Sequence, residues 1–325
     1  MFVLTGHFEI GNYKFDAINE IEITRSIDEI SGSAVIKMPS KFFIKQNGAL
    51  RYTEEAITAG DSVKITIGYK DKLVKQEFVG FVDSIKTGNI IQINCTDGLR
   101  PLKRKDFKCN EQKTTLANVL KKIVEGTDIK LSDKLPEVTL EKFTRKEGNA
   151  MQALQSLKEQ TGLSIFLNDE GKLHCGLQQL FNIGKYAAYD LNYNIVKNDL
   201  QIRTKSDKKI KIVYTAKTKD NQKISVEAGD KDGELQEITQ QMVLDVDTLK
   251  QMANNHLSKL QYDGYEGDLT SFLIPYAAPA MGAKIVDDKR PHRNGIYLIK
   301  KVVTTFGTSG ARRKVSIGNK LANET

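Results

Sequence analysis

The sequence contains few of the residues that most often build disulfides, redox sites or metal sites. Among its 325 residues there are only three cysteines and four histidines. The cysteines, Cys95, Cys109 and Cys175, form no CxxC pair, and an odd, scattered set gives no disulfide framework. Cys95 lies in an alternating stretch typical of a strand, where cysteine usually acts as a small buried hydrophobe. We therefore predict a structural role for all three.

The histidines show no metal-binding pattern either. They stand at positions 7, 174, 256 and 292, so no two are three or four residues apart, as a helix-borne metal pair would require. His256 falls on the apolar side of a predicted helix, and the pair His174-Cys175 falls in a predicted hairpin strand. The acidic stretches at 230–232 and 287–288 lack the alternating ligands of a calcium loop. We predict no metal and no cofactor.

Sequence motifs of nucleotide-binding and hydrolytic enzymes are also absent. The chain has no GxSxG, GxxxxGK[ST] or GxGxxG stretch, which removes the usual anchors for hydrolase, P-loop and Rossmann functions. Two carboxylates could still converge in the fold, as they do in glycosidases, but nothing in the sequence selects a pair. We therefore predict no catalytic residue and no enzymatic activity.

Long apolar runs are missing as well. No stretch approaches the roughly 18 to 20 uninterrupted apolar residues of a membrane span. The first seven residues, Met1–His7, lack a basic region followed by an apolar one, so no secretory signal is predicted. The overall composition is typical of globular proteins, and the length suffices for two or three domains. We expect no membrane partner and maturation in the cytoplasm of the producing cell.

The net charge of +8 is spread over the chain, and its densest patch is residues 100–105. Lysine and arginine release condensed counterions when they bind phosphates, so nucleic acid is one interpretation of this patch. The other is a solvated face that keeps the protein soluble. The second is favoured because acidic residues are interleaved nearly everywhere and no nucleic-acid-binding motif accompanies the charges. Phe107 is the only aromatic residue close by.

A pattern of glycine-opened strands occurs twice, near the two ends of the chain. Each copy has a glycine opening a short strand, a second glycine opening a longer strand, and an alternating third strand. The first copy comprises Gly60–Ile67, Gly80–Ile85 and Ile90–Cys95, and the second comprises Gly282–Val286, Gly295–Val302 and Arg313–Ile317. A duplicated antiparallel module, separated by unrelated sequence, indicates a component of a ring or tube more than a single catalytic pocket.

The strand and helix patterns divide the chain into three domains. Residues 1–105 contain six or seven strands at hairpin spacing, including a hairpin turn at Gly11-Asn12, and predict a small β-barrel; residues 40–59 show no sustained period. Residues 106–185 predict an inserted α+β domain with helices near 115–124 and 150–160. Residues 186–325 predict a second barrel with a helical insertion near 236–262, whose helix spans about 246–260. The predicted fold class is therefore β-rich α+β.

The order of several segments resembles the baseplate hub proteins of contractile phage tails and related injection systems, the family of the phage late control protein D. The segments that carry the resemblance are Ile21–Ala34, Gly60–Val63, Phe78–Val82, Cys95–Leu102, Thr115–Val124, Leu154–Gly171 and Gly295–Gly318. Each motif is short and common in β-barrels. Their order across nearly the full length makes the resemblance more specific.

The resemblance implies two tail-tube-like barrels in one chain and a homotrimer that forms a pseudo-sixfold ring. Such a ring joins the hexameric tail tube to a trimeric spike. The implied partners are the tube or tube-initiator protein, other baseplate proteins and a separate spike protein, because the chain ends in a short polar tail after Leu321. The implied location is the tail baseplate of a virion or injection particle assembled in the bacterial cytoplasm, with DNA only as cargo in the channel.

Two other functions stay open from the sequence alone. One is a tail-associated protein that binds or hydrolyses cell-wall glycan, with the inserted domain as its ligand site. The other is a nucleic-acid-binding barrel that uses the basic residues at 100–105. The sequence does not separate an infectious phage, a bacteriocin-like tail and a cell-to-cell injection device.

Overall fold

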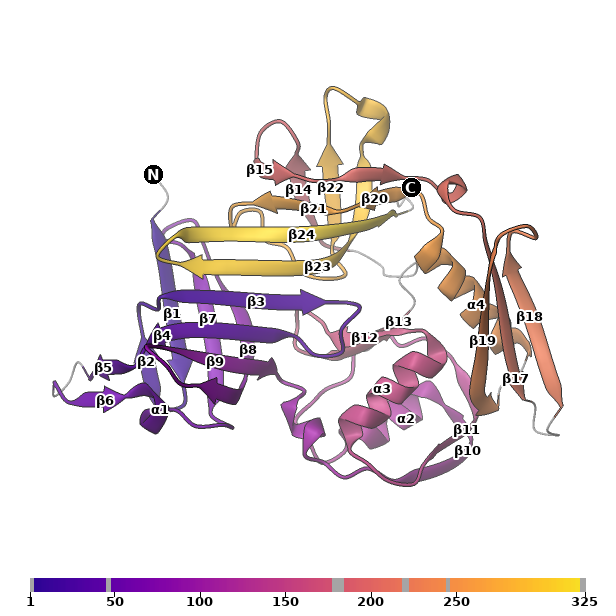
Figure 1. Ribbon diagram of the computed structural model, residues 1–325, viewed down its shortest axis with the longest axis horizontal. Helices are drawn as coiled ribbons and strands as arrows, with labels where there is room; N and C mark the ends of the chain where they lie inside the picture. Colours follow the sequence, from indigo (N-terminus) through magenta and orange to yellow (C-terminus); the bar gives the residue numbers. More distant parts are fainter. Residues whose placement is uncertain (1–2, 45–47, 177–183, 218–221, 244–245, 322–325) are drawn as a thin grey trace.

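The computed structural model describes residues 3–44, 48–176, 184–217, 222–243 and 246–321. Most of the chain is β structure (Figure 1). The first part contributes the strands β1 (Leu4–Ile10), β2 (Tyr13–Phe15), β3 (Glu20–Ser26), β4 (Ser33–Pro39), β7 (Ser62–Tyr69), β8 (Leu73–Lys86) and β9 (Ile90–Asp97). The last part contributes β14 (Tyr186–Asp190), β15 (Ile195–Asn198), β16 (Gln201–Arg203), β20 (Gly264–Glu266), β21 (Asp268–Ser271), β22 (Gly282–Val286), β23 (Gly295–Gly307) and β24 (Gly310–Lys320).

These strands form one fifteen-stranded sheet that is mostly antiparallel. Its main path runs β15-β21-β24-β23-β3-β4-β9-β8-β7-β1-β2, and β14, β16, β20 and β22 join at the side. We call the strands β1–β4 and β7–β9 the first lobe, and the strands β14–β16 and β20–β24 the second lobe. Each lobe has its own apolar core cluster, and the cluster of the first lobe also takes in Leu273, Phe306 of β23 and Ala311 of β24 at the border between the lobes.

Alternation of side chains explains the core of the first lobe. Successive residues of a strand point to opposite faces, so every second residue enters the core. In β3 the buried hydrophobic residues are Ile21 and Ile23, and the neighbouring strands bury Ile36 and Ile93 in the same cluster. The predicted hairpin at Gly11-Asn12 is confirmed by the pairing of Ile10 with Tyr13.

The two lobes meet through backbone hydrogen bonds between β3 and β23. Their antiparallel register pairs Ser26 with Lys301 at one end and Glu20 with Gly307 at the other. Figure 1 shows these strands side by side in the middle of the sheet. The lobes are therefore continuous through a strand ladder, which fixes their relative orientation.

The repeated glycine pattern is found in the structure, with one difference. Gly282 and Gly295 open β22 and β23, as predicted, but Gly80 lies inside β8 and not at its start. β8 is 14 residues long because its first half pairs with β7 and its second half with β9. A Cβ atom at Gly80 would come within 2.2 Å of the Thr96 carbonyl oxygen. The glycine thus permits the close approach of β9 and does not mark a strand end.

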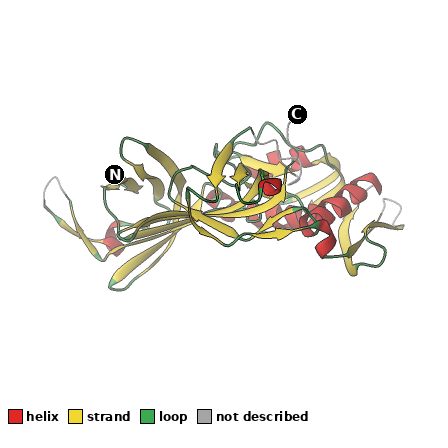
Figure 2. Cartoon of the chain, turned by 90° about the horizontal axis from the view of Figure 1, so that it is seen from above, coloured by secondary structure: helices red, strands yellow, loops and turns green. Residues whose placement is uncertain are grey.

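Residues 40–59, for which the sequence predicts no regular structure, contain three short elements. These are β5 (Lys41–Phe43), β6 (Leu50–Tyr52) and α1 (Thr53–Ala56). Elements of three or four residues are too short to produce a recognisable period. β5 and β6 pair as a hairpin that we call the arm, and Figure 2 shows it extending away from the rest of the chain.

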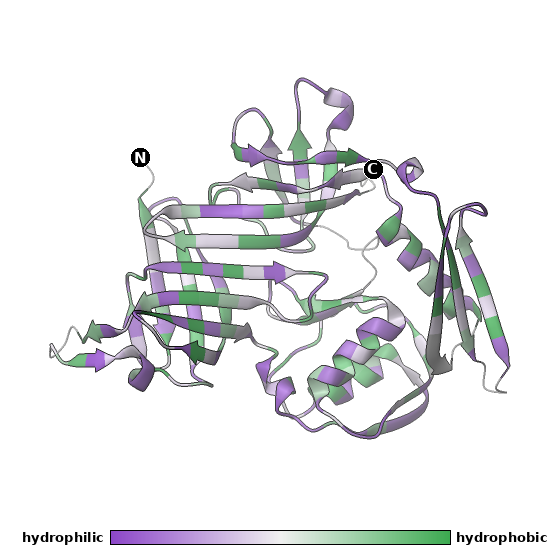
Figure 3. Ribbon diagram, viewed as in Figure 1, coloured by the Kyte–Doolittle hydropathy of each residue, from purple (hydrophilic) through white to green (hydrophobic). Residues whose placement is uncertain are grey.

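The predicted inserted domain contains β10 (Cys109–Thr115), α2 (Leu116–Val124), β11 (Thr139–Arg145), α3 (Ala150–Thr161), β12 (Ser164–Leu167) and β13 (Leu173–Gly176). Thr115 caps α2, since its side chain accepts a hydrogen bond from the Asn118 amide. Asn149 and Gln152 form a capping box at the start of α3, and Gly162 ends it with a φ of 66°. Figure 3 shows hydrophobic and hydrophilic residues alternating along these helices. The two predicted helices are confirmed.

A second α+β element follows β16. It consists of β17 (Ile210–Lys217), β18 (Lys223–Gly229), β19 (Glu234–Val243) and the helix α4 (Val246–Leu260). The segment predicted as a helical insertion therefore begins with a strand, and the helix itself lies where the sequence places it. The described ranges also contain the short 3₁₀ helices η1 (Arg100–Lys103), η3 (Lys205–Asp207) and η4 (Pro291–Arg293).

One apolar core joins α4 and its sheet to the inserted domain. Leu249 of α4, Ile212 of β17, Leu120 of α2 and Leu154 of α3 belong to a single buried cluster. We call this combined unit the helical region. The predicted boundaries at residues 105 and 185 remain proposals. The shared core groups α4 with α2 and α3 of the inserted domain and not with the second lobe. The predicted fold class, β-rich α+β with inserted α+β structure, is confirmed, and the two predicted antiparallel barrels correspond to the two lobes of one shared sheet.

Candidate functional site

A cluster of charged side chains lies where the two lobes and the helical region meet. Its members come from five different segments and share burial and mutual contacts; we call them the junction cluster. They are Arg25 of β3, Lys75 and Glu77 of β8, Asp169 of the β12–β13 turn, Tyr276 between β21 and β22, and Arg313 of β24.

Arg313 and Glu77 form the centre of the junction cluster. Arg313 is fully buried, and its Nη2 and Nη1 atoms lie 2.8 Å and 3.2 Å from the two carboxylate oxygens of Glu77. This is the two-point geometry that guanidinium and carboxylate groups prefer. Arg313 also donates to the carbonyl oxygens of Ala277 and Leu273, at 3.1 Å and 3.3 Å. The pair therefore ties the first lobe to the second.

A β-bulge places Glu77 in this position. The register between β7 and β8 pairs Ile65 with Phe78 and Thr66 with Gln76, which leaves Glu77 without an opposite residue. A bulge of this kind turns the extra side chain away from the direction that strict alternation would give. Glu77 and Phe78 are consequently both buried although they are adjacent in a strand.

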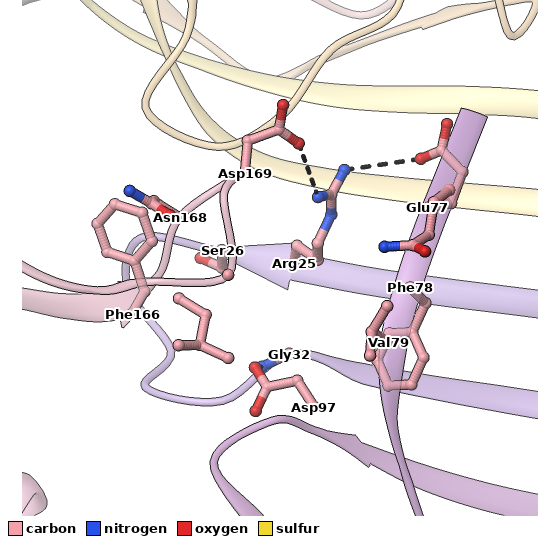
Figure 4. Close-up of a pocket in the computed structure, with 13 residues that line it drawn as sticks. Arg25, Ser26, Gly32, Glu77, Phe78, Val79, Asp97, Phe166, Asn168 and Asp169 are labelled. Atoms are coloured by element: carbon pink, nitrogen blue, oxygen red, sulfur yellow. Dashed lines mark hydrogen bonds and ion pairs between the residues drawn. The ribbon is translucent and has the colours of Figure 1, made fainter. Parts of the chain in front are cut away.

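Arg25 and Asp169 extend the junction cluster to the helical region. Arg25 lies 3.6 Å from Glu77 and 3.4 Å from Asp169 (Figure 4). It also donates a hydrogen bond to the Tyr276 hydroxyl at 3.1 Å. Lys75 lies 3.0 Å from Asp169, and Tyr276 donates a hydrogen bond to the same carboxylate. Asp169 is thus shared by three donors that belong to the two lobes.

The turn that presents Asp169 is built by its neighbours. The side chain of Asn168 accepts hydrogen bonds from the amides of Glu170 and Lys172, and Gly171 adopts a φ of 73°. An asparagine that folds back on the following amides and a glycine with positive φ are typical of a tight turn. The sequence Asn168–Gly171 therefore fixes where the Asp169 carboxylate stands.

The surroundings set the protonation states in the junction cluster. Burial alone would raise the pKa of the Asp169 carboxyl, but hydrogen bonds from Tyr276 and Lys75 and the charge of Arg25 lower it below its ordinary value. Burial raises the pKa of the Tyr276 phenol above its ordinary value. Asp169 therefore stays ionised and Tyr276 stays protonated near neutral pH, which suits a hydrogen bond from the phenol to the carboxylate.

A cavity of about 100 Å³ lies beside the junction cluster, and Asp97 stands on its other side (Figure 4). Asp97 accepts hydrogen bonds from the Ser31 hydroxyl at 2.8 Å and from the amides of Gly32 and Leu99 at 2.5 Å and 3.1 Å. These contacts join two segments, Ile21–Ala34 and Cys95–Leu102, that carry the family resemblance in the sequence. Burial raises the pKa of Asp97 to about 6, although the three hydrogen bonds oppose this.

The raised pKa of Asp97 predicts a pH-dependent contribution to stability. A carboxyl whose pKa is higher in the folded chain than in the unfolded chain stabilises the fold while it is protonated in both. This contribution is present below about pH 4 and is lost as the pH rises through about 6. We expect the difference in free energy of unfolding between the native chain and Asp97→Asn to change over this window and to be constant above pH 7.

Urea unfolding of both chains at several pH values measures this difference. Asp133→Asn is the control, because Asp133 is exposed and its pKa is lowered by the hydrogen bond from Lys172. Protonation of Asp133 changes the stability only below about pH 4. The difference in free energy of unfolding between the native chain and Asp133→Asn should therefore be constant between pH 5 and 7. A native-minus-Asp97→Asn difference that is constant from pH 4 to 7, or that grows in favour of the native chain, would contradict the assignment.

The residues that the sequence singles out lie apart from one another. Cys95 and Cys175 are buried in different cores, and burial raises the pKa of each thiol to about 12, so neither is a reactive thiolate at neutral pH. Cys109 is half-buried, and burial raises its pKa also. The His174 ring lies 3.2 Å from the Ser132 hydroxyl, and the His256 ring lies 2.9 Å from the Tyr214 hydroxyl. Burial lowers the pKa of both histidines.

Within the described ranges, no group of three or more histidine, cysteine, aspartate or glutamate side chains could hold a metal ion. None of the helices in the described part is long and apolar enough to cross a membrane. In the junction cluster each charge faces an opposite charge at 3.6 Å or less. Such an arrangement can hold three parts of a chain in one geometry.

The sequence does not predict the junction cluster, because the members of the cluster are far apart in the chain. Glu77 and Arg313, for example, are separated by 236 positions. The one local signal is the turn sequence Asn168–Gly171, which predicts a turn but not its partners. The bulge at Glu77 breaks the alternation that a strand prediction relies on.

Comparison with known proteins finds similarity in structure only. No protein-family model and no curated protein sequence matches the chain. A tail protein from Neisseria meningitidis has a similar structure, with a TM-score of 0.72 and 12% identity over 97% of this chain and 96% of that protein. The 43 kDa tail protein of prophage MuSo2 from Shewanella oneidensis gives a TM-score of 0.69 and 15% identity over 97% of this chain and 98% of that protein.

A third similar structure comes from a secretion machine. It is an E. coli component of the type VI secretion system, described as similar to the T4 bacteriophage tail proteins gp27 and gp5. Its TM-score is 0.58, with 10% identity over 97% of this chain and 77% of that protein. At identities of 10–15%, these similarities establish that the chain has the fold of phage tail and type VI secretion proteins over nearly its whole length.

Proposed function

We propose that the protein is a structural baseplate hub of a contractile tail or related injection system. Three copies would form a pseudo-sixfold ring that adapts the hexameric tail tube to a trimeric spike. The observation that carries this proposal is the joining of two β lobes in one chain, edge to edge, through β3 and β23. Two similar lobes that pair side by side within one chain form a contact of the kind that would recur around a ring of such lobes.

The unequal insertions give the two faces of such a ring different symmetries. Three chains with two lobes each supply six similar units, which suits a sixfold partner on one face. One part of the helical region is inserted between the lobes and the other between β16 and β20 of the second lobe. The two parts share one core, so a ring of three chains carries only three such regions. The same ring then presents threefold symmetry on the surface that this region forms.

Exposed apolar side chains at both ends of the main strand path support self-association. Near the β2 end, the arm carries Phe43, which is 70% exposed, together with the exposed Leu50 and Tyr52. Near the β15 end, Tyr193 is 88% exposed and Val196 is also exposed. Contact between two different surfaces of identical chains closes into a ring when the rotation allows it. We propose that the β15 end of one copy meets the first lobe of the next.

The proposed partners follow the same scheme. They are the tail tube or tube-initiator protein, a separate spike protein and other baseplate proteins, with DNA only as cargo in the channel. We propose assembly in the bacterial cytoplasm, incorporation into the tail baseplate and a purely structural, non-enzymatic role. The pairing of charges in the junction cluster supports a structural role for that site.

End-on imaging of assembled particles, together with mass measurement of the isolated ring, tests this proposal. We expect three copies of the chain per ring and six similar lobes around the axis. The double variant Tyr193→Ser/Val196→Ser should abolish ring formation, whereas the control Leu235→Ser, which alters an exposed leucine of the helical region, should leave it intact. Six copies per ring, or a strictly monomeric chain in the particle, would contradict the proposal. Lysis of purified cell wall that a single carboxylate replacement abolishes would favour the glycan-directed alternative.

A further inference from the structure

The basic patch at residues 100–105 divides into cations that are engaged within the chain and cations that are not. The Lys105 ammonium donates to the carbonyl oxygens of Lys122, Ile123 and Glu125 at the end of α2. Cations at this end of a helix offset the negative end of its dipole. The Lys103 ammonium lies 3.2 Å from the Asp83 carboxylate. Both lysines are therefore occupied by structural contacts.

Arg100 is buried but only partly paired. Its side chain is 10% exposed, and its Nε atom lies 3.5 Å from Asp83 Oδ1, beyond good hydrogen-bond geometry. Its two terminal Nη atoms make no hydrogen bond with the described residues. Arg104, four positions on, is exposed and has no ion pair or hydrogen bond with its side chain in the described ranges. Among the guanidinium nitrogens of Arg100 only Nε is a buried atom without a hydrogen-bond partner in the described part of the chain, so the Nη donors are open to a group that enters from solvent.

Both arginines line one pocket of about 380 Å³, together with Gly60, Phe81, Pro101, Lys105, Gly126 and Thr127. The Lys105 ammonium is engaged by the end of α2. Gly60 has a φ of 107°, and a Cβ atom there would lie 3.6 Å from the Nη1 atom of Arg100. The terminal nitrogens of Arg100 therefore face the space next to Gly60. Gly60, the first residue of the first repeat copy, has no side chain, so the space next to the Nη atoms of Arg100 stays open.

We propose that this pocket is an oxyanion site in which Arg100 and Arg104 bind one carboxylate side chain of a partner protein. Guanidinium groups bind carboxylates and phosphates through paired, charge-assisted hydrogen bonds. Arg100 supplies the preformed donors in the floor, and Arg104 supplies a second cation from the rim. The choice of a protein partner rests on the proposed assembly function, while the oxyanion site itself does not.

The arrangement favours a single anionic group over a nucleic-acid backbone. A backbone track needs a row of free cations, and binding becomes strongly salt-dependent because several phosphates are neutralised. Here two of the four cations of the patch are occupied by Asp83 and the end of α2. Phe81 is half-buried in the pocket wall, so no exposed aromatic ring stands ready to stack on a base.

A titration of the isolated chain with acetate tests the site. With [¹⁵N]arginine labelling, the Nε signal of Arg100 should shift with saturation as acetate replaces chloride at constant ionic strength, and inorganic phosphate should produce the same response. The signal of Arg312, which is exposed on β24, should not move. In Arg104→Ala the dissociation constant should rise about tenfold, because one charge-assisted contact is removed. The absence of a saturable shift would overturn the site.

Two further measurements identify the source of the anion. Arg104→Glu should reduce incorporation of the chain into particles at least tenfold, whereas Arg312→Glu should not; normal incorporation would overturn the protein-carboxylate assignment. Binding of duplex or single-stranded DNA that Arg104→Ala weakens would overturn it as well and point to a nucleic-acid phosphate. The acetate titration needs no particle, so failure of the proposed hub function would leave the oxyanion site standing.

Discussion

Replacing Arg313 by methionine should lower the free energy of unfolding by about 3–5 kcal/mol, because it leaves the Glu77 carboxylate buried without its main partner. The side chains are 1% and 2% exposed, so water cannot replace the lost interaction. Arg25, at 3.6 Å from Glu77, is shared with Asp169 and compensates only in part. Methionine has a similar length and no charge, so the change tests the charge more than the volume. Urea unfolding measures the effect.

Two further variants separate the ion pair from general damage to β24. Arg312→Met changes the neighbouring arginine, which is exposed and lies on the other face of the strand, and should alter stability by less than about 0.5 kcal/mol. The double variant Glu77→Gln/Arg313→Met should be more stable than Arg313→Met alone, since the unpaired buried charge is gone. If the double variant were as unstable as the sum of the two single variants, the pair would not be coupled and the interpretation would be wrong.

The junction cluster also shows why the sequence predicts the elements better than the site. Periodicity predicts the strands and helices, because alternation and capping are local properties. Glu77, Asp169 and Arg313 come together only through tertiary contacts. In addition, the β-bulge that buries Glu77 removes it from the alternating pattern, so its position in β8 suggests a solvent-facing residue.

Short-range patterns do not predict which neighbours a residue packs against. Ile27 follows Ile21 and Ile23 in an alternating run, yet it lies beyond the end of β3 and packs with Phe166 and Leu298 in a separate small cluster. The basic stretch at 100–105 has the composition of one surface patch. In the structure it divides into a buried arginine, two internally paired lysines and one exposed arginine that pairs with none of the described residues. Composition alone does not distinguish these environments, because the burial and pairing of each cation depend on its contacts with Asp83 and with the end of α2.

The grouping of α4 with the inserted domain can be tested through Leu249. This residue is fully buried in the core that also contains Leu120 of α2 and Leu154 of α3. Polar contacts connect the same elements, since Asn255 of α4 donates to the carbonyl oxygen of Gly162 at 3.0 Å. We expect Leu249→Ala to lower the free energy of unfolding by about 2–5 kcal/mol through lost burial and the cavity that remains.

Hydrogen exchange shows how far this destabilisation extends. If the helical region is one cooperative unit, amides in α2 and α3 should lose protection together with those of α4. Leu235→Ala, which truncates a leucine of β19 that is 54% exposed, is the matched control and should change little. Loss of protection confined to α4, β17 and β18 would instead support a boundary near residue 185. In that case α4 would belong to the second lobe, and the threefold surface of the proposed ring would be built by two independent units instead of one.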